Sequence, residues 1–381
     1  FINRAGTMVL PFLSKYLRED LDFSYNQVKW ILISFGLGSI VGSWLGGKLS
    51  DKIGFYKIMI FSLLTSGIAF FGLQFVTSFE GLLVAMFFIM VVADMFRPAM
   101  FVSLGAYAKP ENRTRALTLV RLAINLGFAA GPALGGLLIM TVGYKGLFWV
   151  DGATCILAIL IFWIKVKEKK KSKYTDKEHP GEILTHSVFK DRPFWIFLGA
   201  TLITGILFFQ LFTTIPLYHK EQFNLSELQT GLLLTLNGVL IFFLEMPIVS
   251  YIERHKINKL KVITIGCLAM AISMYLLLVN YWAGILIIMM LFMTFGEMFV
   301  FPFSNSFAMS RAPKGHEGRY MAIFTMSYST AHILSAEAGM DMIRLFSYQN
   351  NWFFMGTLGI IGVLLFIWTM KLVKYEPPRN L

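Results

Sequence analysis

Long apolar runs alternate with short polar joints along the whole chain. The runs are roughly 17–25 residues long, which is about what an α-helix needs to cross the hydrocarbon core of a bilayer. Because lipid offers no hydrogen bonds to the backbone, a crossing segment must satisfy its own N–H and C=O groups, as an α-helix does. The pattern predicts twelve membrane-spanning helices, at 1–17, 27–47, 57–76, 80–106, 116–140, 146–165, 193–218, 228–250, 261–279, 282–308, 319–345 and 351–372.

The composition favours a membrane protein over a soluble one. Of the 381 residues, 56% are hydrophobic and 15% are charged, whereas a soluble domain has about 25% charged residues. A soluble all-helical protein is the alternative, and it would need about a dozen core helices with almost no solvated face. We therefore expect an all-α membrane protein.

The Lys and Arg residues are distributed unevenly between the two sides of the expected bundle. With the N-terminus placed in the cytoplasm, most of them fall in cytoplasmic joints, in the central linker or in the C-terminal tail. The opposite joints hold only Lys15, Arg18, Lys29, Lys145, Lys220 and Arg344. Under the positive-inside rule, this asymmetry predicts a multi-pass protein of the plasma (cytoplasmic or inner) membrane with both termini cytoplasmic.

The net charge of +12 has two interpretations. A basic protein can bind nucleic acid, but these charges are scattered over short joints that flank the membrane. The basic run 165–177 (KVKEKKKSKYTDK) is most simply a solvated linker that faces anionic lipid headgroups. We therefore expect the lipid bilayer, and no nucleic acid, as a partner.

The chain ends and the cysteines add little chemistry. The sequence begins with Phe1 rather than Met, so we expect that further residues precede it, and no cleavable signal peptide is apparent. Cys155 and Cys267 lie inside separate apolar runs, and neither their spacing nor their context suggests a disulfide or a metal site. No cofactor is expected.

An internal repeat divides the chain into two domains. The stretch 93–98 (ADMFRP) corresponds to 296–302 (GEMFVFP), so that a small residue, an acid, Met-Phe and a proline recur in both halves. The expected domains are an N-terminal six-helix bundle, a basic cytoplasmic linker and a C-terminal six-helix bundle with a short tail, at 1–165, 166–192 and 193–381. Repeated six-helix halves are a common plan of secondary transporters, which bind substrate at the midplane between the halves.

The joint after the second run reads GGKLSDKIGFYK over 46–57. Glycine at 47 lets helices approach closely, glycine at 54 permits a tight turn, and an aspartate between them can cap a helix or pair with a cation. The joint resembles the loop signature of the major facilitator superfamily. The resemblance implies a gating motif formed by Gly47, Asp51, Lys52, Gly54 and Lys57.

The fifth run contains GFAAGPALGG over 127–136. It is similar to the fifth-helix signature of the superfamily's antiporters, which include proton-coupled drug exporters. The motif residues are Gly127, Gly131, Pro132, Gly135 and Gly136. Small residues let a partner helix pack against bare backbone and proline bends a helix, so ordinary helix packing is the alternative. The corresponding SAEAG of the eleventh run lacks the proline.

Ionisable residues inside apolar runs cost roughly 2.5–3.5 kcal/mol each on insertion scales, so they usually have partners and a function. They are Arg4, Asp94, Arg97 and Arg121 in the first half, and Glu245, Glu297, Glu337 and Asp341 in the second. Asp94 and Arg97 are three residues apart and can meet on one helix face. The pair is either a proton switch, in which protonation releases the arginine, or a permanent structural ion pair.

The acids of the second half have different expected roles. Glu297 is the repeat mate of Asp94 and a candidate for proton coupling or for binding a cation. Glu337 and Asp341, four apart on one face, either share a proton or lie in a wet outer vestibule. Glu245 is expected to be a gate or packing partner. The proton-coupling candidates are therefore Asp94, Glu297, Glu337 and Asp341.

Polar and aromatic side chains within the runs are candidates for the substrate site, namely Arg4, Arg97, Gln210, Asn237 and Phe299. Gln210 and Asn237 either orient a substrate or bridge helices. The opening FINR resembles the first helix of proton-coupled oligopeptide transporters, although Asn3 replaces the acid found there. This resemblance implies an alternative function, the proton-coupled import of peptides or other small solutes.

Other classes of membrane protein are less consistent with the sequence. No phosphate-binding glycine loop is present, and no metal-ligand spacing or nucleophile–base arrangement points to an enzyme. A passive channel would not require the repeat. We expect a monomeric, proton-coupled transporter of the major facilitator fold, closest in its motifs to the drug antiporters. It would export lipophilic or cationic small molecules by alternating access.

Overall fold

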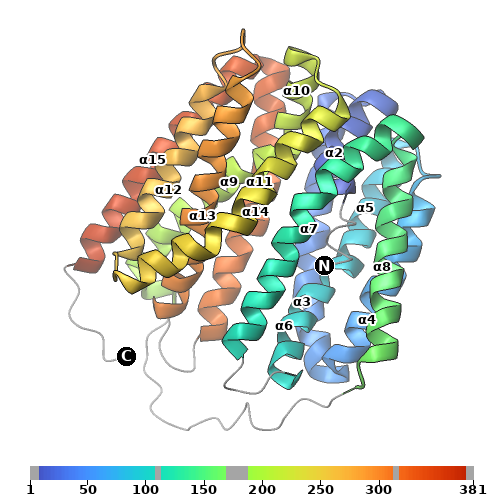
Figure 1. Cartoon of the computed structure of the whole chain (residues 1–381), viewed down its shortest axis with the longest axis horizontal. Helices are drawn as coiled ribbons and strands as arrows, with labels where there is room; N and C mark the ends of the chain where they lie inside the picture. The colour runs from blue at the N-terminus through green and yellow to red at the C-terminus, as the bar shows by residue number, and fades with distance from the viewer. Residues whose placement is uncertain (1–7, 108–112, 169–187, 312–316, 375–381) are drawn as a thin grey trace. The chain divides into compact units, whose positions relative to one another are not determined.

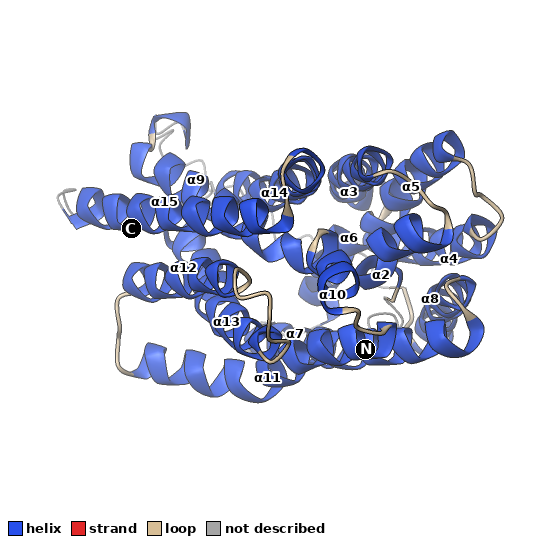
Figure 2. Ribbon diagram, turned by 90° about the horizontal axis from the view of Figure 1, so that it is seen from above, coloured by secondary structure: helices blue, strands red, loops and turns tan. Residues whose placement is uncertain are grey.

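The computed structural model describes residues 8–107, 113–168, 188–311 and 317–374. All regular secondary structure in these ranges is helical (Figure 2). The described helices of the first half are α2 (Val9–Lys15), η1 (Tyr16–Asp20), α3 (Tyr25–Ile53), α4 (Phe55–Leu73), α5 (Phe79–Asp94), α6 (Phe96–Tyr107), α7 (Arg113–Val142) and α8 (Lys145–Lys165). Those of the second half are η4 (Val188–Lys190), α9 (Arg192–Thr213), α10 (Ile215–Phe223), α11 (Glu227–Arg254), α12 (Lys259–Leu276), α13 (Ile285–Arg311), α14 (Glu317–Leu345) and α15 (Tyr348–Lys374).

The helices coincide with the apolar runs of the sequence. Among the described residues, nine helical segments are long and apolar enough to cross a membrane. The three remaining expected spans, the first, fifth and eleventh, correspond to α2, α7 and α14. The first and fifth are only partly described, and α14 carries more polar residues. The chain is an all-α membrane protein.

One expected span, 80–106, is interrupted in the structure. Helix α5 ends at Asp94 and α6 begins after Met95. Pro98 weakens the helix here, because it has no N–H to donate to the Asp94 carbonyl four residues earlier and its ring crowds that carbonyl. The equivalent Pro302 lies inside the continuous helix α13. The sequence repeat is therefore not accompanied by the same backbone break in both halves.

The expected span 193–218 is also divided. Helix α9 ends at Thr213, and α10 starts after Thr214 with Pro216 in its first turn. Proline is well tolerated there because the first N–H groups of a helix have no partner within the helix. The short α10 then ends at Asn224, whose left-handed conformation closes the helix.

Contacts between Cα atoms divide the chain into two compact units. The first comprises Phe1–Thr175 and Phe212–Phe242, so α10 and the first half of α11 pack on the N-terminal helices. Inside it, α3 lies against α5, where a Cβ at Gly38 or Gly42 would overlap backbone carbonyls of the facing helix. Small residues thus bring the two backbones into direct contact.

The second unit comprises Asp176–Leu211 and Phe243–Leu381. In it, α12 lies between α13 and α15 (Figure 1), with Gly266 facing Gly296 across one of these contacts. Its core is aromatic and includes Phe197, which packs against rings of α13, α14 and α15. The division into moving domains at 1–165 and 193–381 stays a prediction.

Candidate functional site

Asp94 forms the pair expected from the sequence. Its Oδ1 lies 3.8 Å from Arg97 Nη2. Its Oδ2 accepts a hydrogen bond from the Ser39 hydroxyl of α3. The Asp94 side chain is 13% exposed and the Arg97 side chain is 48% exposed. A half-buried carboxylate at a helix break, held by a neutral donor and a movable cation, is suited to exchange these contacts for a proton.

Sequence reasoning missed Ser39. Its neighbour Gly38 is where α3 and α5 touch, and this contact brings the serine hydroxyl to the end of α5. Glycines at 38, 42 and 46 recur every four residues, which marks one face of a helix. That spacing was the available signal for a polar residue placed next to a close helix contact.

Glu297 and Phe299 lie on α13 in the second unit, and both are half-buried. Phe299 packs against the aromatic core, and a Cβ at Gly266 of α12 would stand 2.8 Å from the Phe299 Cβ. Phe299 thus packs between α12 and α13, and its expected role in a substrate cavity stays a prediction. Glu297 belongs to a different unit from Asp94.

Gln210 bridges two helices. Its side chain is fully buried on α9. Its Nε2 donates to the Ser335 carbonyl at 3.0 Å and to the Ser335 hydroxyl at 2.8 Å. Of the two roles left open by the sequence, the described contacts are those of a helix bridge. The other polar candidate, Asn237, is half-buried on α11.

The two acids of α14 differ in their surroundings. Glu337 is exposed, and Asp341 is half-buried with its Oδ1 3.1 Å from Arg344 Nη2. Because Arg344 balances the charge of Asp341, the pair of acids does not need a shared proton. The arrangement favours the alternative in which these acids lie in a wet region.

Three sequence candidates lie beyond what the structure describes. Arg4 precedes the first described residue, and the side chains of Asp51 and Arg121 are outside the described set. Glu245 is 8% exposed on α11. Its burial is compatible with the expected gate or packing role.

The gating motif is only partly arranged as the sequence suggested. A Cβ at Gly47 would meet nothing within 4 Å, whereas one at Gly46 would lie 2.5 Å from the Met95 carbonyl oxygen. The close approach assigned to Gly47 is therefore wrong, and Gly46 makes it. Gly54 has φ +94°, as the tight turn between α3 and α4 requires. Lys52 and Lys57 are exposed.

The fifth-helix motif forms a contact between α7, α2 and α11. A Cβ at Gly135 would lie 3.0 Å from the Phe12 ring, and one at Gly136 would overlap the Glu227 carbonyl. Reciprocally, a Cβ at Gly231 of α11 would overlap the carbonyl of Pro132. The two backbones therefore touch on both sides of the crossing, which only glycine permits.

A side chain of α11 also bonds the backbone of the motif. The Ala133 N–H donates to the Thr235 hydroxyl at 3.1 Å. Pro132 next to it has no N–H, so the helix is locally short of internal hydrogen bonds. This segment of α7 is consequently tied to α11 by polar and steric contacts together. Gly127 and Gly131 are buried on the same helix.

A group of ionisable residues built around the buried Lys15, here called the Lys15 cluster, lies at the opposite end of α3 from Gly54. It consists of Lys15, Glu19, Tyr144, His219 and Glu227. Lys15 has no exposed surface, and its Nζ lies 3.1 Å from a Glu227 oxygen and 3.8 Å from a Glu19 oxygen. The Tyr144 hydroxyl donates to Glu19 at 2.8 Å. The sequence counted Lys15 among the charges of the outer joints and gave no sign that its side chain is buried.

His219 and Tyr144 are electrostatically perturbed within the Lys15 cluster. His219 is fully buried on α10, and neither of its ring nitrogens has a hydrogen-bond partner in the described residues. Burial, and then the charge of Lys15, lower the pKa of His219 to about 3. Burial, and then the charge of Glu19, raise the pKa of Tyr144. The cluster is thus a low-dielectric site that favours a neutral imidazole.

A second buried ion pair stabilises the C-terminal unit. Asp191 caps the start of α9 by accepting the Phe194 N–H at 3.2 Å. Arg311 Nε and Nη2 donate to the same carboxylate at 3.1 and 2.5 Å, and the Tyr320 hydroxyl donates at 3.0 Å. Asp191 falls within the linker expected at 166–192, and Arg311 falls in the joint after the run expected at 282–308. Both are buried and join three helices.

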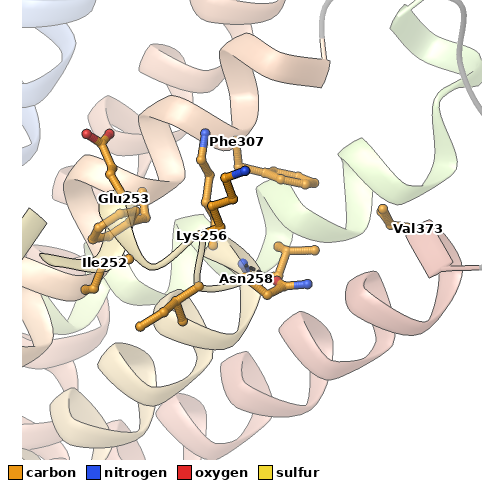
Figure 3. Close-up of a pocket in the computed structure, with 10 residues that line it drawn as sticks. Ile252, Glu253, Lys256, Asn258, Phe307 and Val373 are labelled. Carbon is orange, nitrogen blue, oxygen red and sulfur yellow. Dashed lines mark hydrogen bonds between the residues drawn. The ribbon is translucent and has the colours of Figure 1, made fainter. Parts of the chain in front are cut away.

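A pocket of about 500 Å³ lies where α11 turns into α12. Figure 3 shows its lining from α11, the joint before α12, α12, α13 and α15, with Ile252, Glu253, Lys256, Asn258, Phe307 and Val373 labelled. It contains none of the site residues expected from the sequence. Among the described residues, no three His, Cys, Asp or Glu side chains are grouped as metal ligands would be.

Comparisons with known proteins relate the whole chain to membrane transporters. A Na⁺, Li⁺, K⁺/H⁺ antiporter of Planococcus maritimus is 23% identical, covering 100% of this chain and 96% of the relative. The quinolone resistance protein NorA of Staphylococcus aureus is 25% identical over 61% of this chain and 59% of its own length. A solved peptide-bound transporter of the POT family superposes with a TM-score of 0.79 at 16% identity, covering 98% of this chain and 94% of that one.

The family match covers most of the sequence. Residues 1–336 match the sequence model of the Major Facilitator Superfamily. The motifs at 46–57 and 127–136 lie inside that range, and the helical fold agrees with it. This confirms the family and fold expected from the sequence: the chain is a multi-pass transporter, not an enzyme, and belongs to the Major Facilitator Superfamily.

Proposed function

We propose that the protein is a proton-coupled antiporter that exports lipophilic or cationic small molecules by alternating access. The observation that carries this proposal is that Asp94 contacts both Ser39 and Arg97 at the break between α5 and α6. A carboxylate in this position changes both its charge and its helix contacts when it binds a proton. That is the property that a coupling residue needs.

The proposed mechanism starts with Asp94 ionised. The Ser39 hydroxyl ties the end of α5 to α3, and Arg97 balances the charge. Proton binding removes the charge that holds Arg97 and weakens the hydrogen bond from Ser39. A conformation that differs in these contacts then gains in population, because a ligand shifts an equilibrium by its differential affinity for the two states. Glu297, the repeat mate of Asp94, is the proposed coupling acid of the other half.

The gates of this cycle are proposed to be two glycine contacts. One is the loop from Gly47 to Lys57, where Gly46 and Gly54 set the helix approach and the turn. The other is the crossing of Pro132–Gly136 with α11. With both termini in the cytoplasm of an inner-membrane protein, as the Lys and Arg distribution predicts, the Lys15 cluster lies at the outer ends of the helices.

The relatives support antiport more than import. The full-length relative is named as a cation/H⁺ antiporter, and a second relative is named for quinolone resistance. The peptide-bound structure is 16% identical, and identity at this level supports a shared fold but not a shared substrate. Proton-coupled peptide import is kept as the alternative because of Arg4 and Glu297. The expected partners are a small-molecule substrate and protons, with the protein acting as a monomer.

Two charge-neutralising variants test the proposal. In proteoliposomes with an imposed pH gradient, Asp94→Asn and Glu297→Gln should lose gradient-driven movement of a lipophilic cation. Glu80→Gln is the matched control, because Glu80 is an exposed acid in the first turn of the same helix as Asp94. Elution from a sizing column in detergent reports folding. Unchanged gradient-driven transport in both variants would rule out these coupling residues.

A further inference from the structure

Asp151 is a buried carboxylate on α8 that the proposed mechanism does not use. Its residue is 4% exposed. One carboxylate oxygen accepts the Met8 N–H at 2.8 Å and the other accepts the Val9 N–H at 3.2 Å. These N–H groups belong to the start of a helical stretch that continues from α2 through η1 to Asp20. Asp151 therefore anchors the beginning of that stretch to α8.

Among the described residues, no cation balances the charge of Asp151. In the described part of the chain its hydrogen bonds come only from the two backbone N–H groups, and it has no ion pair. An ionised carboxylate can accept about four hydrogen bonds, so the described residues use half of its capacity. Burying a carboxylate without a cation is costly, and a group in this position reduces the cost by taking up a proton.

Apart from the buried thiol of Cys155, one turn further along α8, the ionisable groups on the helices packed against Asp151 are distant along those helices or, like Arg4, outside the described residues. Lys15 lies at the other end of α2, roughly 10 Å along the helix axis from Met8, and is paired with Glu227. On α4, Tyr56 and Lys57 lie near the helix start, far along the helix from the contact with α8 at Gly67. On α8, Lys145 and Lys165 lie at the two ends. Helix α7 carries Arg113, Arg115 and Arg121, whose side chains are not described.

The two helices joined by Asp151 differ in how firmly they are held. Helix α8 is locked to α4, because a Cβ at Gly67 would lie 3.0 Å from the Gly152 carbonyl oxygen. A Cβ at Gly152 would lie 2.8 Å from the Gly67 carbonyl oxygen. Helix α2 has only seven residues, and its far end is held by the ion pair between Lys15 and Glu227. Phe12 of α2 also lies against Gly135 of α7. Asp151 thus provides one of several attachments of α2, the one that joins its start to α8.

We propose that Asp151 is a second proton-binding site, whose occupancy decides whether α2 stays attached to α8. When the carboxylate binds a proton, one oxygen becomes a hydroxyl donor and the charge that strengthened both N–H contacts is lost. The Met8 and Val9 N–H groups are then free to take other partners, and α2 moves relative to the fixed pair α4–α8. The role of this site in the transport cycle rests on the proposed proton coupling, but proton binding itself does not.

Infrared difference spectroscopy of the purified full chain, recorded during a pH titration in lipid, tests proton binding directly. A protonated carboxyl group has a C=O band that an ionised one lacks. We expect one such component to appear on acidification of the wild type, to be absent in Asp151→Asn and to be shifted in Asp151→Glu. Thr154→Val is the matched control, because the Thr154 hydroxyl bonds only to carbonyls of α8 itself. It should leave the component unchanged.

The pH profile of transport in proteoliposomes separates this inference from the proposed function. If transport by Asp151→Asn does not depend on pH and the infrared component is lost, the result supports both the Asp151 proton site and the proposed proton coupling. The wild type could instead show no proton-coupled transport but have an infrared component that Asp151→Asn removes. That result would contradict the proposed function and support proton binding by Asp151. Retention of the full spectrum in Asp151→Asn overturns the inference. If that variant does not fold, an unshifted component in Asp151→Glu overturns it equally.

Discussion

The ammonium group of Lys15 lies 3.1 Å from a carboxylate oxygen of Glu227, a residue 212 positions further along the chain. The lysine side chain has no exposed surface, and that of Glu227 is 16% exposed. Lys15 is the last residue of α2, and Glu227 is the first residue of α11, where Gly136 of α7 also makes contact. The ion pair therefore closes the same junction that the fifth-helix motif forms.

Removal of the Lys15 charge should destabilise this junction. In Lys15→Met, Glu227 keeps a largely buried charge without its partner, which costs about 3 kcal/mol for a pair of this burial. Thermal unfolding in detergent should show a clear drop in Tm. Lys145→Met is the control, because Lys145 is exposed at the start of α8. The double reversal Lys15→Glu with Glu227→Lys should recover part of the loss. A reversal no more stable than the single variants would contradict the pairing.

His219 should make stability depend on pH. Its pKa is about 3 in the folded protein and about 6.5 when solvated, so the unfolded state binds a proton that the folded state excludes between these values. The free energy of unfolding is therefore unaffected above pH 6.5 and falls as the pH is lowered through that window. From pH 7 to pH 5 the loss should be roughly 2 kcal/mol.

The measurement is the Tm at a series of pH values for the wild type and for His219→Gln. The variant cannot take up a proton at this position, so its Tm should fall less between pH 7 and pH 5. His255→Gln is a suitable control, because His255 is exposed on the joint between α11 and α12. Equal pH slopes for the wild type and His219→Gln would show that the buried imidazole does not contribute.

Alanine substitutions at Gly136 and Gly47 should have opposite effects on stability. Gly136→Ala places a Cβ on the Glu227 carbonyl and forces α7 away from α11, at an expected cost of about 1–3 kcal/mol. Gly47→Ala meets open space and gains helix propensity, so it should be neutral or slightly stabilising. Thermal unfolding and transport assays compare the two. An equal change in Tm and transport for the two variants would mean that α7 and α11 are not in tight contact at Gly136.

The carboxylate of Asp191 should matter for stability and not for coupling. Replacing Arg311 by Met removes the two guanidinium hydrogen bonds from the buried Asp191 carboxylate, and should cost about 3 kcal/mol. Arg311→Lys should recover only part of this, because lysine cannot reproduce the two-pronged contact. Both variants should keep the wild-type pH dependence of transport. A shifted pH profile would assign the pair a coupling role instead.

The helices were predictable because length and hydropathy are local properties. Pro98 and Pro302 occupy equivalent places in the repeat, yet only the first coincides with a helix break. A proline weakens a helix in either place, and packing decides whether the chain breaks there. The pairing of Asp94 with Arg97 was also predictable, because residues three apart on a helix are neighbours.

The partners of buried charges were not predictable. Lys15 pairs with Glu227, Asp151 with the backbone at Met8, and Asp191 with Arg311, and each pair is more than 100 residues apart. A hydropathy pattern reports that a residue is near a membrane boundary but not which distant helix end it meets. Gly46, by contrast, continues a four-residue spacing with Gly38 and Gly42, so its contact was readable from the sequence.

The central claim is proton antiport, and proton movement during substrate entry tests it most directly. Proteoliposomes that contain the protein and a luminal pH dye would receive a lipophilic cation outside, in the absence of any initial gradient. The account predicts that the lumen becomes alkaline as the cation enters and protons leave, and that Glu297→Gln abolishes this signal. Cation entry without a pH change would contradict the account, as would acidification of the lumen when di- and tripeptides are added instead.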